Sequence, residues 1–225
     1  MIQVVKVKNR EEGNRKAHDI LKKLVDNKTL LALSGGTSPD YQKMIVEPTD
    51  ILPGAVCIVD ERCGPDYYED SNYYLLKTSG VLYFLRKNKI PFSPDAYERN
   101  PSAMACDYEE EIDELFKKYH KKVGVMGVGS NLHTAGIFPN SSATSNVDLV
   151  VMDEVDDKFP DRVTLTLKAL GEFTNFVILA FGKEKKEALK KVLDEKENNM
   201  QKYPAIFYRK SKMKSYLITD QNVNI

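Results

Sequence analysis

The sequence predicts an α/β fold of three layers, in which helices cover both faces of a mostly parallel sheet. Short runs rich in β-branched residues alternate along the chain with segments of helical periodicity. Several of these runs are apolar at consecutive positions, as expected for strands that are buried on both faces. The 225 residues are enough for one well-buried core, and no linker, repeat or low-complexity stretch divides them. We therefore expect one domain spanning residues 1–225.

Each expected element has its own local signal. The expected strands are apolar runs at 2–7, 29–33, 55–59, 122–126, 148–152, 162–167 and 175–181. Two further apolar runs follow at 204–208 and 215–219. The expected helices are a stripe formed by Ala17, Ile20, Leu21, Leu24 and Val25, a helix capped by Ser71, a stripe from Met104 to Tyr119, and a helix over 183–194.

Charge and cysteine content exclude several classes of function. Lys and Arg together number 33, as do Asp and Glu, so no overall field favours nucleic acid or an anionic membrane. The three cysteines, Cys57, Cys63 and Cys106, lack CxxC spacing and indicate neither a disulfide framework nor a zinc site. No segment reads as a signal peptide or a membrane span. We expect a cytoplasmic protein without a metal, either a monomer or a small homo-oligomer.

Polar loops follow four of the predicted strands, those at 29–33, 55–59, 122–126 and 175–181. Ligands of open α/β sheets bind outside the carboxyl ends of the strands, so we expect these loops to converge on one site. The loops carry Ser34, Gly35, Gly36, Thr37 and Ser38, then Asp60, Glu61 and Arg62, then Asn131 and His133, and finally Gly182, Lys183 and Lys185.

The loop "SGGTS" at 34–38 has a composition suited to an anion. Glycine lets the backbone approach an oxyanion closely, the N–H groups at a helix start attract negative charge, and the hydroxyls add donors. The loop lacks the lysine of a Walker motif, and a tight turn with Ser38 as a helix N-cap explains it equally. Arg62 matches phosphate through paired donors, or forms a surface ion pair with a neighbouring acid.

His133 is the one histidine of three that lies in a glycine-containing loop directly after an apolar strand. A neutral imidazole at that place is able to take a proton from water near pH 7, although a lone histidine is often structural. Among the lysines after 175–181, one lies close enough to the strand end to reach a phosphate. Arg162 lies at the start of its predicted strand, the wrong end for this site unless that strand runs antiparallel. "GVGSNL" lacks the third glycine of a dinucleotide fingerprint, so no cofactor is expected.

Five segments, in this order along the chain, resemble the 6-phosphogluconolactonase family. They are "LSGGTSP", "VDERCGPDYYEDSNYYLL", "GVGSNLHTAGIFP", "RVTLTLKAL" and "FGKEKKEAL", which match the family's SGG, DER…SNY, GxGxDGHTASLFP, RxTLT and GxxK patterns. The family is related to glucosamine-6-phosphate deaminase and ribose-5-phosphate isomerase. The deaminases resemble this chain less, because they carry DEY in place of DER and HIAFNEP in place of the His-Thr-Ala block.

The resemblance implies a modified Rossmann-like fold and hydrolysis of 6-phosphoglucono-1,5-lactone, a phosphosugar lactone of the pentose phosphate pathway. It implies that His133 is the base that activates water. It implies that the substrate phosphate is held by Ser34, Gly35, Gly36, Thr37, Ser38, Arg62, Arg162 and Lys185.

The chain departs from the family pattern next to the histidine. Asn131 and Leu132 stand where the family has Asp-Gly, and Gly136 stands where it has serine. Asparagine accepts a hydrogen bond but brings no charge, and leucine is strained wherever glycine serves a positive φ. Three alternatives follow. One is an active lactonase whose histidine partner is Asn131, Asp60 or Glu61. The others are a sugar-phosphate-binding protein with weakened catalysis, and a deaminase or isomerase of the same superfamily.

Overall fold

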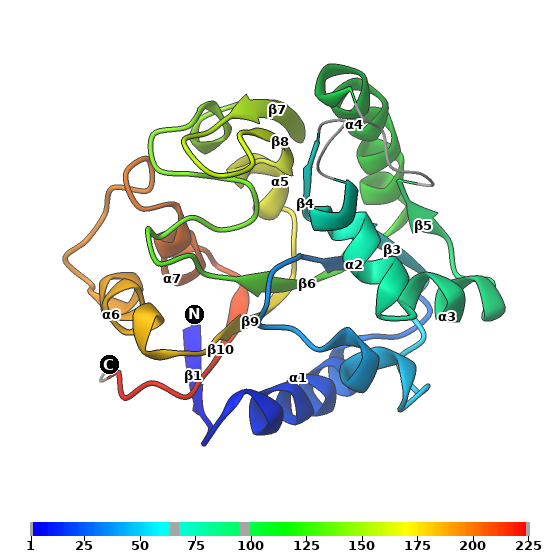
Figure 1. Ribbon diagram of the computed structural model, residues 1–225, viewed down its shortest axis with the longest axis horizontal. Coiled ribbons are helices and arrows are strands. Elements are labelled where there is room, and N and C mark those ends of the chain that lie inside the picture. The colour runs from blue at the N-terminus through cyan, green and yellow to red at the C-terminus, as the bar shows by residue number, and fades with distance from the viewer. Residues whose placement is uncertain (1, 64–67, 95–99, 224–225) are drawn as a thin grey trace.

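The computed structural model describes residues 2–63, 68–94 and 100–223, so residues 64–67 of the DER…SNY block lie outside the described part. Its main element is a seven-stranded parallel sheet with the order β1-β10-β9-β6-β2-β3-β5 (Figure 1). The strands are β1 (Ile2–Lys6), β2 (Thr29–Leu33), β3 (Ala55–Ile58), β5 (Phe92–Ser93), β6 (Lys121–Gly127), β9 (Asn175–Ala180) and β10 (Lys214–Thr219). The predicted α/β class is confirmed.

Several helices begin where the sequence supplies an N-cap side chain. Asn9, Ser71 and Asn100 cap α1, α2 and α4 through side-chain oxygens that accept backbone N–H groups. The α-helices are α1 (Arg10–Leu24), α2 (Asn72–Thr78), α3 (Val81–Lys87), α4 (Pro101–Lys118), α5 (Leu167–Leu170), α6 (Lys186–Leu193) and α7 (Phe207–Lys210). Shorter helical turns are η1 (Gln42–Val46), η2 (Tyr68–Asp70), η3 (Ser142–Thr144), η4 (Lys183–Lys185) and η5 (Pro204–Ile206).

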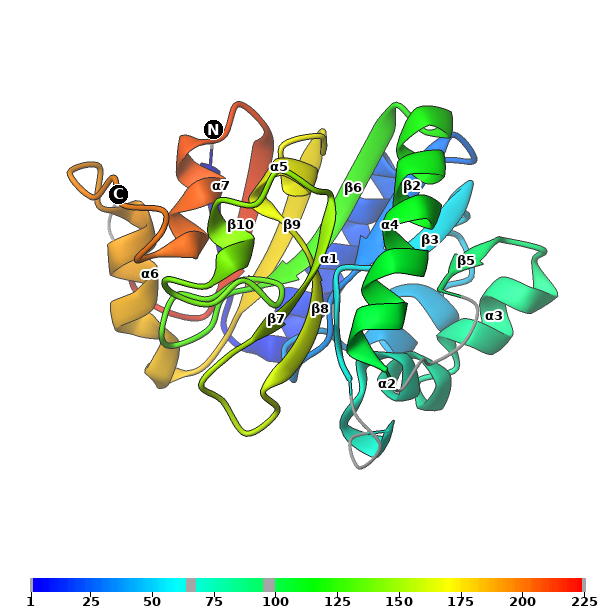
Figure 2. The same ribbon diagram turned by 90° about the horizontal axis from the view of Figure 1, so that it is seen from above.

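Helices lie on both faces of the parallel sheet. Helix α1 lies on one face, and α4, α5 and α7 lie on the other, as the two views together show (Figures 1 and 2). The interior strand β2 is buried at all five positions, which explains its unbroken apolar sequence. The two late apolar runs differ in outcome, since 204–208 is helical and 215–219 lies within β10.

Two predicted strands do not belong to the main sheet. The runs at 148–152 and 162–167 form β7 (Val150–Glu154) and β8 (Asp161–Leu165). In a separate sheet of order β4-β8-β7, β8 pairs antiparallel with both β4 (Asp60–Arg62) and β7. Val59 joins the two sheets, because its N–H donates to Leu33 of β2 and its carbonyl accepts from Leu165 of β8. The prediction that these two runs are strands is confirmed, but the expectation that they belong to the main parallel sheet is wrong. A single hydrophobic cluster includes buried side chains of both sheets.

Candidate active site

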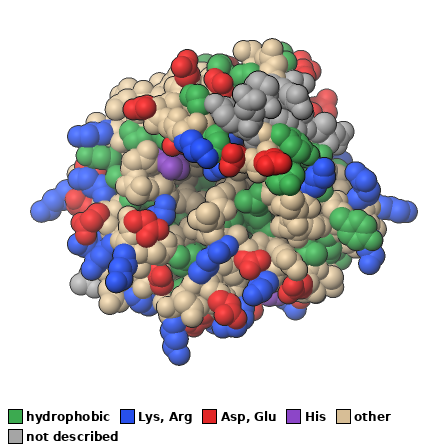
Figure 3. All heavy atoms as spheres, in the orientation of Figure 1, with side chains coloured by type: hydrophobic (Ala, Val, Ile, Leu, Met, Phe, Trp, Pro, Cys, Tyr) green, Lys and Arg blue, Asp and Glu red, His purple; other side chains and the backbone are tan. Residues whose placement is uncertain are grey.

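The carboxyl ends of four adjacent strands surround one pocket. Strands β9, β6, β2 and β3 are neighbours in the sheet, so the loops that follow them meet at one edge. The pocket has a volume of about 270 Å³. Figure 3 shows this face hollowed, with histidine, basic and acidic side chains gathered around the hollow. The predicted site residues that line the pocket are Ser34, Gly35, Gly36, Thr37, Ser38, Asp60, Arg62, His133, Arg162 and Lys185.

The loop after β2 supplies one side of the pocket with backbone and hydroxyl donors. Gly36 has a positive φ of 86°, and a Cβ on Gly35 would lie 1.7 Å from Oδ1 of Asn72, so both glycines are required by the backbone path. The hydroxyl of Ser34 is buried and has no hydrogen-bond partner within the described chain. The alternative of Ser38 as a helix N-cap is wrong, because the following helical turn η1 has Tyr41 at its cap position. The loop therefore offers an unused donor to a ligand.

The short strand β4 explains why neighbouring acids have different surroundings. Side chains of a strand alternate between its two faces, so Asp60 and Arg62 share one face and Glu61 takes the other. Glu61 is fully buried and accepts hydrogen bonds from the backbone N–H groups of Arg62, Asn72 and Tyr73, at 2.6–2.8 Å. Desolvation raises its pKa to about 7. Glu61 holds the start of α2 and does not line the pocket.

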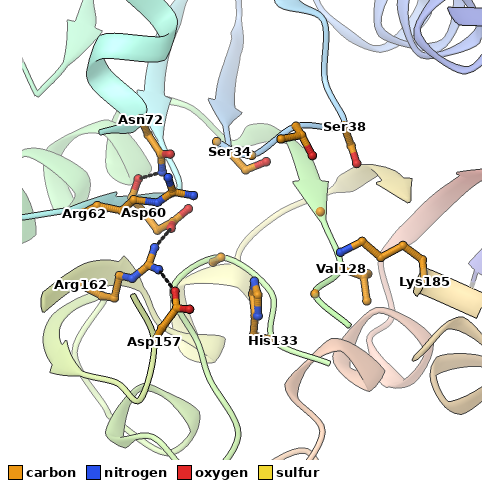
Figure 4. Close-up of a pocket in the computed structure, with 16 residues that line it drawn as sticks. Ser34, Ser38, Asp60, Arg62, Asn72, Val128, His133, Asp157, Arg162 and Lys185 are labelled. Atoms are coloured by element: carbon orange, nitrogen blue, oxygen red, sulfur yellow. Dashed lines mark hydrogen bonds and ion pairs between the residues drawn. The ribbon is translucent and has the colours of Figure 1, made fainter. Parts of the chain in front are cut away.

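Arg162 reaches the pocket because β8 runs antiparallel to β4. An antiparallel strand was the condition under which a residue at the start of this strand could belong to the site. Arg162 is the direct register partner of Arg62, so the two guanidinium groups extend from one face of the small sheet. Carboxylates and a carbonyl surround Arg162 (Figure 4). Its Nη2 lies 2.5 Å from Asp157, its Nη1 lies 3.8 Å from Asp60, and its Nε donates to the carbonyl of Phe159. These acids balance two adjacent positive charges.

Asp60 is the acid most deeply placed in this wall. Its side chain is 8% exposed, and desolvation raises its pKa, while Arg162 and Arg62 act in the opposite direction. The amide of Asn72 donates to the Asp60 backbone carbonyl at 2.6 Å. Asp60, Arg62, Asn72, Asp157 and Arg162 therefore form one connected wall, which we call the arginine wall (Figure 4).

His133 projects into the pocket from the loop after β6 (Figure 4). Its Nδ1 lies 2.6 Å from Oδ1 of Asn131, and the same oxygen accepts the His133 backbone N–H at 3.1 Å. The imidazole stacks on Phe138 with ring centroids 4.5 Å apart. Asn131 does not line the pocket, yet it fixes the ring, as expected of a histidine partner.

The residues around His133 explain the glycines and the strain of this loop. A Cβ on Gly129 would lie 2.2 Å from Nδ1 of His133, so only glycine leaves room for the imidazole. Leu132 adopts a positive φ of 68°, and its side chain is buried. A left-handed leucine costs on the order of 1 kcal/mol or more, which confirms that the family's glycine position is strained here.

Electrostatics keep His133 neutral. Desolvation, together with the positive charges of Arg162, Lys185 and Arg62, lowers its pKa to about 4, while Asp157 acts in the opposite direction. The unprotonated ring therefore predominates near neutral pH. An anion bound beside these cations would cancel part of their effect and make the imidazole more basic.

Lys185 completes the pocket on the side opposite the arginine wall (Figure 4). It lies in η4, which follows β9 through Gly182, a residue with a positive φ of 99°. Lys185 is half-buried, and desolvation lowers its pKa. Its ammonium extends toward the loop at 34–38, so the two provide adjoining donors on one side of the pocket.

Sequence reasoning missed two polar residues that line the pocket, Asn72 and Asp157. Asn72 directly follows the predicted cap Ser71, so its place at the start of a helix could have marked it as a site residue. Asp157 lies in the loop between β7 and β8 and carried no local signal, because its place depends on the pairing of β8 with β4.

The described ranges of the chain hold neither a metal-binding cluster nor a membrane-spanning helix. No group of three or more His, Cys, Asp or Glu side chains there is arranged to hold a metal ion. Within the same ranges, every helix is too short or too polar to cross a membrane.

Known enzymes of two classes are similar to this chain. A curated glucosamine-6-phosphate deaminase of Lactobacillus johnsonii is 26% identical over 211 residues, which cover 86% of this chain and 85% of the relative. The solved 6-phosphogluconolactonase of Leishmania guyanensis superposes with a TM-score of 0.80 at 22% identity, covering 97% of this chain and 96% of the other. A solved monomeric glucosamine-6-phosphate deaminase gives a TM-score of 0.75 at 19% identity, covering 96% and 97%.

Both enzyme classes share this fold, so structural similarity does not distinguish the two reactions. The family model of glucosamine-6-phosphate isomerases and 6-phosphogluconolactonases matches residues 11–217, nearly the whole chain. This match includes every loop that lines the pocket. The chain belongs to the glucosamine-6-phosphate isomerase/6-phosphogluconolactonase family.

Proposed function

We propose that this protein hydrolyses 6-phosphoglucono-1,5-lactone to 6-phosphogluconate. The observation that carries the proposal is the imidazole of His133, which Asn131 orients and which points into the pocket. One side of this pocket holds Lys185 and the loop at 34–38, and the opposite side holds the arginine wall. A lactone carbonyl is already electrophilic, so an anchored substrate and a positioned base supply much of the catalysis that hydrolysis needs.

The substrate phosphate binds, in this proposal, between the loop at 34–38 and Lys185. The loop supplies N–H groups and the unpartnered hydroxyl of Ser34, and Lys185 supplies a positive charge. Arg162 is the weaker candidate for this contact, since its Nε and Nη2 already donate hydrogen bonds to Phe159 and Asp157 and its Nη1 lies 3.8 Å from Asp60. Binding energy at the phosphate end then orients the ring at the reacting end.

The hydrogen bond to Asn131 determines which nitrogen of His133 acts. Oδ1 of Asn131 only accepts, so Nδ1 of the neutral ring carries the proton and Nε2 carries the lone pair. Nε2 takes a proton from water as the water oxygen bonds to the lactone carbonyl carbon. The tetrahedral intermediate collapses by breaking the ring C–O bond, and the imidazolium returns the proton to the leaving oxygen. Arg62 and Arg162 place positive charge beside the developing oxyanion.

A deaminase reaction is the second candidate, and Asp60 is the observation that favours it. Isomerisation of an amino sugar phosphate requires a base that moves a proton between adjacent carbons, and Asp60 presents a carboxylate to the pocket. The curated relative from Lactobacillus johnsonii is named as a deaminase. Against this candidate, Asp60 lies 3.8 Å from Arg162 and belongs to the ion-pair system of the wall.

One pair of assays separates the candidates. We expect the purified protein to accelerate lactone hydrolysis above the spontaneous rate, and to release no ammonia from glucosamine 6-phosphate. Ammonia release without lactone hydrolysis would replace our proposal with the deaminase. Binding of 6-phosphogluconate with neither activity would indicate the sugar-phosphate-binding protein instead.

A further inference from the structure

We propose that Asp157 is a specificity-determining residue, which excludes ligands that carry a second anionic group at the arginine wall. The inference rests on the proposed function, because it assigns the phosphate to the Lys185 side of the pocket. It extends that function by naming what the opposite side rejects. A phosphosugar whose far end is uncharged is accepted, whereas a far-end carboxylate or a second phosphate is disfavoured.

The position of Asp157 is the first support for this inference. Asp157 lies in the turn between β7 and β8, lines the pocket, and has 39% of its side chain exposed. Its Oδ2 lies 2.5 Å from Nη2 of Arg162, whose own side chain is only 6% exposed. Asp157 thus occupies the donor of Arg162 that an incoming anion would use.

The distribution of charge is the second support. Among the described residues that line the pocket, the two acids are Asp60 and Asp157, and both belong to the arginine wall. They offset part of the charge of Arg162 and Arg62. Glu184, the acid that acts on the pKa of Lys185, does not line the pocket. The pocket therefore has one side with an available positive charge, and another side where carboxylates offset part of the positive charge (Figure 4).

The difference in charge between the two sides of the pocket has a consequence for the proposed reaction. Hydrolysis converts an uncharged ester carbonyl at the wall into a carboxylate, while the phosphate at the other end is unchanged. The product therefore carries a new negative charge facing Asp157. Repulsion between like charges across a partly desolvated pocket weakens product binding relative to substrate and favours release.

A matched pair of ligands tests the inference without any turnover. 6-Phosphogluconate and glucitol 6-phosphate share the six-carbon chain and the phosphate, and differ by a carboxylate against a CH₂OH group. We expect titration calorimetry to show that Asp157→Asn lowers the dissociation constant of 6-phosphogluconate by about three- to tenfold. The dissociation constant of glucitol 6-phosphate should change by less than about twofold, because the far end of this ligand is neutral.

Asp156→Asn is the control, since Asp156 is the exposed neighbour in the same turn and the substitution removes the same charge. Asp157→Ser is a second variant, which leaves Nη2 of Arg162 more open and should tighten 6-phosphogluconate at least as much. An unchanged ratio of the two dissociation constants in both Asp157 variants would overturn the inference. Equal weakening of both ligands would also overturn it, since Asp157 would then only support Arg162.

The two proposals fail in different ways. A shifted ratio in a protein that does not hydrolyse the lactone would refute the proposed function alone. Lactone hydrolysis accompanied by an unchanged ratio would refute the role of Asp157 alone.

Discussion

The two sheets contribute to the pocket in opposite ways. The loops beyond the parallel sheet present groups that are still available to a ligand, such as the hydroxyl of Ser34 and the ammonium of Lys185. The small antiparallel sheet presents Arg62 and Arg162 from paired strands, already held by carboxylates and carbonyls. In the proposed function, the loops beyond the parallel sheet bind and react with the substrate, and the small sheet shapes the electrostatic field around them.

His133→Ala tests the reacting region and has the largest expected effect. Loss of the base should lower kcat by about 10³-fold, because general-base catalysis contributes on this scale. The thermal midpoint should move little, since the imidazole stacks on a single ring. His120→Ala, at an exposed position, is the control. Retention of kcat in the His133 variant would remove this residue from the mechanism.

Arg162→Met tests the shaping region, and here the main effect should be on stability. Removal of the guanidinium leaves the buried Asp60 without its closest cation, at a cost of about 3 kcal/mol in the free energy of unfolding. The loss should be larger at pH 8 than at pH 5. The substitution raises the pKa of Asp60 in the folded state, so stability falls as the pH rises through that value.

Lys185→Met is the matched substitution in the binding region. Urea denaturation should detect a smaller loss of stability than for Arg162→Met, and equal losses would contradict the comparison. We expect KM for the lactone to rise by ten- to thirtyfold, roughly the value of a charge-assisted hydrogen bond, with kcat nearly unchanged. Lys183→Met, at an exposed neighbouring position, should leave KM within about twofold of the parent value.

Asn131→Asp should produce the smallest change, a rise in kcat of a few-fold. In the parent protein the acid limb of kcat/KM should lie near pH 4, because the base must be neutral and its pKa is about 4. A carboxylate beside Nδ1 favours the imidazolium and raises that pKa, so the limb should move to higher pH. A pH profile and a kcat that both stay unchanged would show that residue 131 does not tune the base.

Much of the site was predictable from the order of the loops. The runs around Leu31, Val56, Val123 and Val177 indicated a parallel sheet, and the carboxyl-edge rule then grouped the loops that follow them. The sequence left open whether Asn131, Asp60 or Glu61 serves His133. Strand alternation decides against Glu61, but that argument requires knowing that residues 60–62 are a strand.

What the sequence by itself determined is therefore local: the strands and helices, the glycines at 35 and 36, and the departure at Asn131 and Leu132. Hydrophobic periodicity and turn chemistry act over a few residues, so a single chain reveals them directly. Only the tertiary structure decided that β8 pairs antiparallel with β4 and brings Arg162 and Asp157 to the pocket. Pairing between strands about 100 residues apart depends on the whole packed core, and no local pattern encodes it.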